Sequence, residues 1–256
     1  MKKIIILSLV TVLTLAVSAY PQFGLSDYFN SSDPVLWGDY SHDGGYATVE
    51  NGYLNLTTTQ GIRHGRGQIS SNFSLSGDLY TSIDFELLKF DDYFSTATFG
   101  IWARDNSFAM LIDRKLDIDL INYYEEVHWM VDGNWQTGFS SPTSDFTGKL
   151  RLSRVGNGLS AFYYSAGGWQ LANSVVLPSG YDSPVRVFLE AGNAGDIGNA
   201  PRVEVHYDNF MADASGITGV DSRYIVAQPE PGTVILLGTG LLGLGAINRF
   251  RTRKRK

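Results

Sequence analysis

Carboxylates and histidines are the side chains in this sequence that could carry acid–base or nucleophilic chemistry. The stretch KLDIDLINYYEE holds Asp117 and Asp119 two residues apart, followed by Glu125 and Glu126. Two carboxylates that face one cleft can act as nucleophile and acid on a glycosidic bond. The four histidines are scattered, and the sequence has neither a Gly-x-Ser-x-Gly elbow nor a His-rich zinc spacing. Serine-hydrolase and zinc chemistry are therefore not expected, and the carboxylates must be judged by the elements that position them.

Aromatic rings are numerous, and flat rings can pack against the apolar faces of pyranoses while polar groups bind sugar hydroxyls. In TFGIWARD, Trp102 and Arg104 alternate with Phe99, Ile101 and Ala103. We expect Trp102 and Arg104 to share the face that is not core and, on a concave sheet, to bind a sugar. The alternative for any one ring is packing in the core. The other candidate rings are Tyr123, Tyr124, Trp129, Trp135, Phe162, Tyr164 and Trp169.

The elements that must position these residues are β-strands, because apolar and polar residues alternate from about residue 44 to residue 213. In PVRVFLEAG, Val185, Val187 and Leu189 fall on one face and Arg186 and Glu190 on the other. Helical periodicity is nearly absent. About a dozen short strands in one domain predict a two-sheet antiparallel sandwich. Among the strands expected are 46–50, 52–58, 67–74, 95–103, 106–113, 117–123, 126–131, 149–155, 158–164 and 168–175.

Two Asn-Gly pairs lie between expected strands. They are Asn51-Gly52 in VENGY and Asn157-Gly158 in VGNGL, and each predicts a tight hairpin. Residues 214–228 lose the alternation, so we expect a sandwich domain over 20–213 and a linker over 214–228.

The order of these segments resembles the concanavalin A-like lectin/glucanase jelly rolls. The segments that carry the resemblance are VENGYLNLTT, SNFSLSGDLYTSIDFELL, GKLRLSRVGNGLSAFYYSAGGW and VRVFLEAGNA followed by VEVHYDNF. The resemblance implies a jelly-roll sandwich; a fibronectin-like or other β-sandwich is the alternative. Glucanases of that group carry Glu-x-Asp-x-x-Glu on the catalytic strand. KLDIDLINYYEE has a different spacing and no glutamate at the nucleophile position, so no catalytic residue is expected.

The segment YDNF resembles the last strand of many jelly-roll carbohydrate-binding modules, where an aspartate helps hold a structural Ca²⁺. The resemblance implies Asp208 as a ligand, with Asp27 in LSDYFNSSDP as a possible partner and carbonyl oxygens completing the shell. The alternative is that Asp208 caps a turn or accepts hydrogen bonds from backbone amides.

Residues 1–19 have the pattern of a secretory signal peptide. Lys2 and Lys3 precede an apolar stretch over 4–17, and small residues end at Ala19, where signal peptidase would cleave. The apolar stretch is shorter than the roughly 20 residues that a retained membrane anchor needs. We therefore expect the chain to be exported.

Residues 229–256 combine Pro229-Glu230-Pro231, an uncharged segment over 233–247 and a basic tail. As a helix the segment would be roughly 22 Å long, enough to cross a thin bilayer, with the basic tail on the cytoplasmic side. The three parts in this order resemble the PEP-CTERM sorting signal of Gram-negative bacteria that carry an exosortase. The alternative is a plain tail anchor. The basic tail consists of Arg249, Arg251, Arg253, Lys254, Arg255 and Lys256.

The charge and composition of the chain exclude some classes of binding partner and of chemistry. Eight of the 20 basic residues but only one of the 26 acidic residues, Glu230, lie in the two ends, so the body carries a net charge of about −13. Such a body repels nucleic acid, and without cysteine it has no disulfide or thiolate chemistry.

Together these features predict a non-catalytic surface or matrix protein. It would pass through the inner membrane transiently, be processed by an exosortase, and bind exopolysaccharide at the cell surface or in the extracellular matrix. The alternatives are a structural surface protein without a specific ligand and a divergent glycoside hydrolase.

Overall fold

A computed structural model describes residues 23–90, 95–116, 123–193 and 200–227, and for 123–125 and 227 it describes the backbone alone. The signal peptide expected over 1–19 and the membrane helix expected over 233–247 lie outside these residues. Within the described ranges, no helix has the length and apolar character needed to cross a bilayer.

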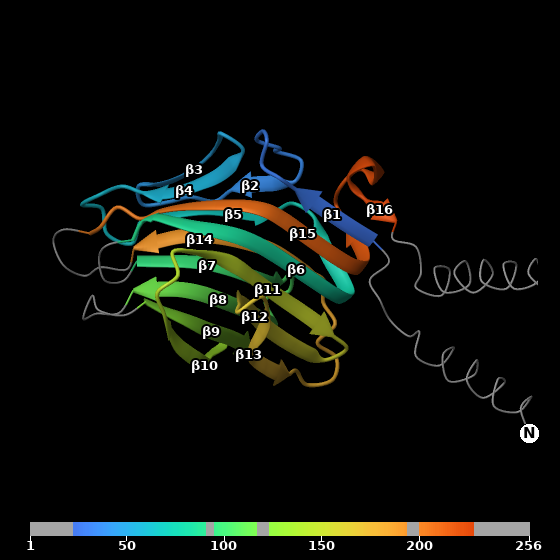
Figure 1. The fold of residues 1–256 in the computed structure, drawn as a ribbon. Coiled ribbons are helices and arrows are strands. Elements are labelled where there is room, and N and C mark those ends of the chain that lie inside the picture. The colour runs from blue at the N-terminus through green and yellow to red at the C-terminus, as the bar shows by residue number, and fades with distance from the viewer. Residues whose placement is uncertain (1–22, 91–94, 117–122, 194–199, 228–256) are drawn as a thin grey trace, which may run out of the picture.

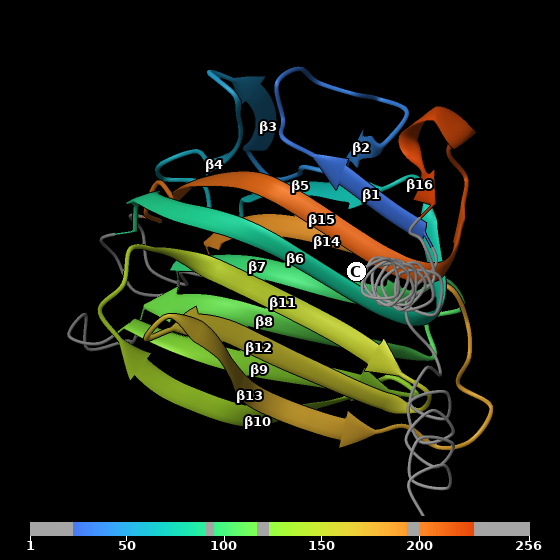
Figure 2. The ribbon, with the colours of Figure 1, turned by 45° about the vertical axis from the view of Figure 1, so that its right-hand side comes forward.

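The chain folds into two antiparallel sheets packed face to face, which confirms the predicted jelly-roll sandwich (Figures 1 and 2). The cleft sheet has the order β2 (Trp37–Asp39), β5 (Arg66–Ser71), β14 (Val185–Asn193), β7 (Ser95–Ala103), β8 (Phe108–Leu116), β9 (Tyr123–Val131) and β10 (Asn134–Thr143). The outer sheet has the order β3 (Gly45–Glu50), β4 (Tyr53–Thr58), β15 (Glu204–Thr218), β6 (Ser74–Lys89), β11 (Thr147–Val155), β12 (Gly158–Ser165) and β13 (Gly168–Val176). Within the described ranges, one backbone pairing, Val185 with Leu75, joins the two sheets.

The core lies between the two sheets, and the predicted alternation decides which side chains enter it. On β14, Val185, Val187 and Leu189 are fully buried in the core, as expected. Arg186 and Glu190 point to the opposite face of the sheet, where they line a cavity. Burying each of these aliphatic side chains contributes about 1.5–3 kcal/mol to the stability of the fold. A shift of the strand by one residue would expose all three, so the observed facing is strongly favoured.

The predicted hairpins form, one of them with a shifted turn. Asn51 and Gly52 both have positive φ, at 53° and 82°, and connect β3 to β4 as expected. In the second hairpin Val155 pairs with Gly158, so the two turn residues are Gly156 and Asn157 rather than Asn157 and Gly158. Gly156 supplies the positive φ, 54°, that the turn requires.

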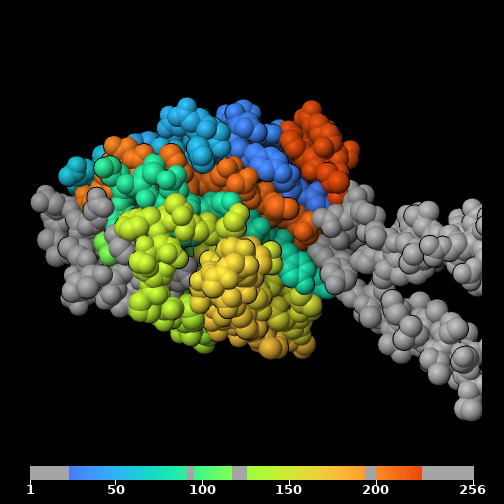
Figure 3. Space-filling view, in the orientation of Figure 1, coloured from blue at the N-terminus to red at the C-terminus, as the bar shows by residue number. Residues whose placement is uncertain are grey.

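The linker expected over 214–228 is largely structured in its described part. β15 continues to Thr218 and stays paired with β6, and a short 3-10 helix follows at Ser222–Tyr224. The strand β16 (Val226–Ala227) then pairs with β1 (Phe23–Asp27). The first and last described segments therefore lie side by side at one edge of the sandwich, blue beside red in Figure 3.

Candidate functional site

A cavity of about 650 Å³ lies in the face of the cleft sheet that points away from the core. Most of its lining comes from β5, β14, β7 and β8. Tyr40 adds a wall from the loop after β2, and Trp135 adds one from β10. Sites for small ligands usually have volumes of about 300–1,000 Å³, so the cavity is large enough to hold a ligand.

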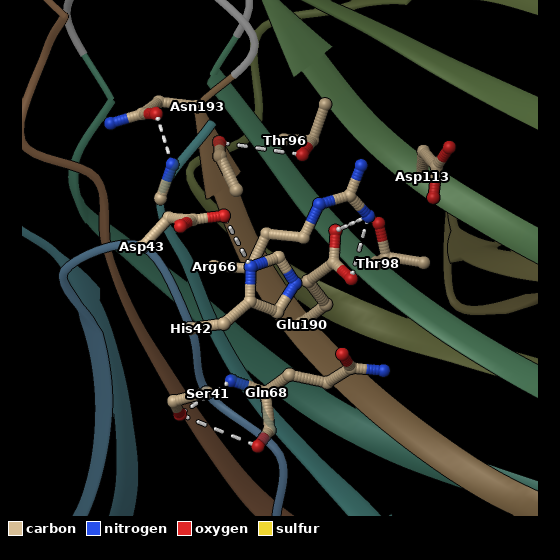
Figure 4. Close-up of polar contacts among 12 residues, drawn as sticks. Ser41, His42, Asp43, Arg66, Gln68, Thr96, Thr98, Asp113, Glu190 and Asn193 are labelled. Carbon is tan, nitrogen blue, oxygen red and sulfur yellow. Dashed lines mark hydrogen bonds and ion pairs between the residues drawn. The ribbon is translucent and has the colours of Figure 1, made fainter. Parts of the chain in front are cut away.

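A row of polar side chains crosses the floor of this cleft. Gln68 pairs with Glu190, Glu190 with Thr98, and Thr98 with Asp113, on four neighbouring strands. Directly paired residues project from the same face of a sheet, so the four side chains point into the cleft together (Figure 4). Since β7 lies between β14 and β8, the backbones at Glu190 and Asp113 are about 10 Å apart.

Glu190 is neutralised by Arg66. Arg66 Nη1 donates to Glu190 Oε1 at 2.9 Å and to Oε2 at 3.0 Å. The side chain of Glu190 is 8% exposed, whereas that of Arg66 is 49% exposed. The charge of a nearly buried carboxylate is thus balanced by a guanidinium that reaches it from the rim of the cleft.

Asp113 is the second carboxylate of the row, and its environment is different. Its Oδ2 lies 3.4 Å from His128 Nε2, and its Oδ1 is buried without a hydrogen-bond partner among the described residues. Burial raises the pKa of Asp113 to about 6, against the opposing effect of His128. The cleft floor therefore contains one carboxyl group that changes protonation near neutral pH.

His128 links Asp113 to the neighbouring strand β9. Its Nε2 lies 3.3 Å from Glu126 Oε2, and its Nδ1 lies 2.8 Å from the hydroxyl of Thr137. The hydrogen bond with Glu126 raises the pKa of His128 and lowers that of Glu126. Asp113 is therefore held by a histidine that is itself held by a second carboxylate and a hydroxyl.

The other end of the cleft is aromatic. Trp102 and Trp135 are in edge contact with centroids 5.5 Å apart, and Phe188 lies 6.2 Å from Trp102. A Cβ atom at Gly100 would lie 2.1 Å from the ring of Phe188, so only glycine leaves room for that ring. Arg186 pairs directly with Trp102 across β14 and β7 and also lines the cleft.

The structure does not bring Trp102 and Arg104 together as one surface. Trp102 lines the cleft, but Arg104 follows the last residue of β7, where the alternation of the strand has ended. Its guanidinium donates to the hydroxyl of Ser74 at 2.9 Å and to the carbonyl of Phe73 at 2.9 Å. Arg104 therefore holds the turn before β6, and the arginine beside Trp102 is Arg186.

The other candidate rings are distributed over the molecule. Trp135 joins the cleft, while Trp129 packs against the core. Tyr164 and Trp169 contact each other on the outer sheet, with Arg151 over the ring of Trp169.

The two aspartates expected to hold calcium lie on adjacent strands. Asp27 of β1 pairs with Phe210, two residues from Asp208 on β15. Asp27 accepts hydrogen bonds from the backbone amide of Phe29 and from the indole of Trp37, both at 2.8 Å. Asp208 accepts one from the amide of Asn209 at 2.6 Å. The described ranges contain no cluster of three or more metal-ligating side chains, and calcium binding stays a prediction.

The carboxylates that the sequence analysis considers for catalysis are not the two that lie on the cleft floor. Asp117 and Asp119 lie outside the described residues, and Glu126 supports His128 beside the cleft. Asp113 and Glu190 were missed as site residues, although each is an acid inside a mostly apolar strand, in MLIDRK and VFLEAG. That contrast was the available signal, because charged residues are seldom buried without a partner.

Comparisons with known proteins bear on the sorting motif and on the fold. The family described as the PEP-CTERM protein-sorting motif matches residues 229–251. The described fold is similar to LamAcat from Zobellia galactanivorans, with a TM-score of 0.58 at 12% identity over 77% of this chain and 99% of that one. No curated protein sequence matches the chain.

Two further solved structures share the fold. The β-glucanase of Bacillus licheniformis has a TM-score of 0.52 at 13% identity, covering 75% of this chain and 97% of its own. The Emp47p carbohydrate recognition domain has a TM-score of 0.54 at 13% identity, covering 75% and 95%. The chain therefore carries a PEP-CTERM protein-sorting motif after a jelly-roll sandwich of the kind found in glucanases and lectins.

Proposed function

We propose that this protein is sorted by an exosortase to the cell surface or extracellular matrix of a Gram-negative bacterium, where its cleft binds polysaccharide without cleaving it. The observation that carries the binding proposal is the cleft itself, which combines an aromatic end with a row of polar side chains. Rings of this kind suit pyranose faces, and the polar row suits hydroxyls. The sorting motif at 229–251 supports the exported location.

The similar structures support a glycan as the ligand class. One is named a carbohydrate recognition domain, and a variant of the Zobellia protein is described in complex with laminaritriose and laminaritetraose. These names belong to those proteins, and identities of 12–13% carry only the fold across to this chain. The ligand of this protein must therefore be inferred from the side chains that line its own cleft.

The binding proposal predicts that Trp102→Ala weakens glycan binding at least tenfold, because it removes the ring at the centre of the aromatic end; this corresponds to about 1.4 kcal/mol. Purified full-length protein would be screened on a glycan array, and the best ligand would be titrated by calorimetry. Trp169→Ala on the outer sheet removes the same side chain away from the cleft and should bind as the wild type does. Absence of binding to every glycan would favour the structural surface protein instead.

The sorting proposal predicts that replacing Pro229, Glu230 and Pro231 with alanine retains the full-length chain in the inner membrane. The exosortase would no longer recognise its processing site. Immunoblots of membrane and extracellular fractions would measure the retention. Release equal to that of the wild type would contradict it.

Glycoside hydrolysis is a second candidate, favoured by Asp113 and Glu190. Their row places two carboxylates on the floor of one cleft, and the pKa of one is raised to about 6, as a general acid requires. Binding is preferred because both oxygens of Glu190 are engaged by Arg66. Release of reducing ends from a bound polysaccharide, lost in Glu190→Gln, would establish hydrolysis instead.

A further inference from the structure

We propose that the cleft selects an acidic polysaccharide and that Arg186 binds the anionic group of the sugar packed at the aromatic end. The inference rests on the proposed glycan-binding function and names the class of glycan.

Arg186 lines the cleft and has no partner in the described part of the chain. It makes no hydrogen bond, ion pair or ring contact with any described residue. Arg66, the other arginine that lines the cleft, is engaged by Glu190. A partly buried guanidinium has five N–H donors in a planar fork, which fits a carboxylate or a sulfate oxygen pair. Arg186 is therefore available to a ligand, whereas Arg66 is not.

Arg186 lies beside the aromatic rings, so one sugar could contact both the guanidinium and a ring. It pairs directly with Trp102, which places the Cβ atoms of the two residues about 4.5–5.5 Å apart. Trp135, in edge contact with Trp102, is 47% exposed and offers a ring face to a ligand. A pyranose at this end would present its anionic substituent to Arg186.

The charges of the cleft also limit how densely charged the ligand can be. Glu190 is four residues beyond Arg186 on β14, about 13 Å away at roughly 3.3 Å per residue, and Asp113 lies at that same level. A second anionic sugar there would face Asp113. A chain in which neutral sugars separate the anionic ones avoids this repulsion. The body's net charge of about −13 also disfavours non-specific attraction of polyanions.

The test compares matched polymers on the full-length protein. Hyaluronan and its carboxyl-reduced form probe a carboxylate, and κ-carrageenan and its desulfated form probe a sulfate. We expect at least tenfold tighter binding of the charged form in one pair, which also identifies the anionic group. Arg186→Gln should reduce that preference to less than threefold while leaving binding of the neutral form intact. Arg186→Lys should retain part of the preference, because it keeps the charge and loses the fork.

Lys149→Gln is the control, because it removes one positive charge from the outer sheet, where Lys149 pairs with Asp84. It should leave the preference unchanged. Equal affinity for charged and neutral forms, or a preference that survives Arg186→Gln, would overturn the inference while leaving glycan binding in place. Failure to bind either form of any polymer would instead overturn the proposed function, and the inference with it.

Discussion

Replacing Asp113 with asparagine should raise the free energy of unfolding at pH 7 by about 2–3 kcal/mol. Asparagine has nearly the same shape but no charge to bury. Burial raises the pKa of Asp113 from 3.8 to about 6, and each unit corresponds to about 1.4 kcal/mol of preference for the neutral form in the folded protein. The ionised carboxylate therefore destabilises the native state at neutral pH, and Asp113→Asn removes that cost.

The stability gained in Asp113→Asn should depend on pH. Between pH 3.8 and about 6 the folded protein holds a proton on Asp113 that the unfolded chain has lost, so this carboxyl lowers stability as the pH rises through that window. The difference between variant and wild type should be small below pH 4 and complete above about pH 7. Denaturant unfolding at several pH values would measure it. Asp145→Asn, which changes an exposed carboxylate in the loop before β11, is the control and should show no such difference.

The contact with His128 favours the charged form of Asp113 and so opposes the effect of burial. The pKa of His128 is raised from 6.5, chiefly by Glu126 and further by Asp113, so it contributes stability below pH 6.5 that is lost at higher pH. Because this contribution is lost only as the pH rises through the raised pKa of His128, part of it remains at pH 7, and Asp113→Asn removes the share that Asp113 supplies. A variant less stable than the wild type at pH 7 would show that the contact with His128 outweighs the cost of burial.

A carboxylate that costs stability indicates a role other than holding the fold. Asp113 lines the cavity, and its Oδ1 has no hydrogen-bond partner in the described part of the chain. Sites that bind ligands commonly carry groups that are unfavourable for folding alone. Because Asp113 lines the cavity, its carboxyl group is in a position to interact with a glycan bound in the cleft, which agrees with the proposed function.

The faces of the strands could be predicted from the sequence, but the cleft could not. Alternation in PVRVFLEAG correctly separated Val187 from Arg186 and Glu190, because a strand has a strict period of two. The row from Gln68 to Asp113 depends on β5, β14, β7 and β8 being neighbours, although residues 68 and 190 are far apart in the chain. Strand order comes from tertiary pairing, and no local pattern reports it.

The errors occurred where strands end. The prediction that Arg104 shares the face of Trp102 is wrong, because it extends the alternation one residue past Ala103, the last residue of β7. The linker predicted from residue 214 begins too early, because Ser215 and Gly216 weaken the alternation although the pairing of β15 with β6 continues to Thr218. Periodicity identifies the interior of a strand, whereas its ends are fixed by partners that the sequence does not reveal.

Replacing Arg66 with glutamine should lower the free energy of unfolding at neutral pH by about 3 kcal/mol. The change leaves the carboxylate of Glu190, which is 8% exposed, without its guanidinium. Removing one partner of a buried ion pair costs about 3–5 kcal/mol, and the half-exposed position of Arg66 places this pair at the lower end. Arg202→Gln is a matched control, because Arg202 and Glu204 are 47% and 17% exposed. Its cost should stay below about 1 kcal/mol, since that pair lies nearer to solvent.

A double-mutant cycle separates the loss of the pair from the loss of the arginine side chain. Glu190→Gln alone should cost less than Arg66→Gln, because a guanidinium at the rim of the cleft regains water whereas a carboxylate at the floor does not. The double variant should then be more stable than Arg66→Gln by at least about 1 kcal/mol, since it removes the unpaired charge. Chemical denaturation of the four proteins would measure this coupling. Additive costs would mean that Arg66 stabilises the cleft through its packing, and that the carboxylate of Glu190 is free to contact a ligand.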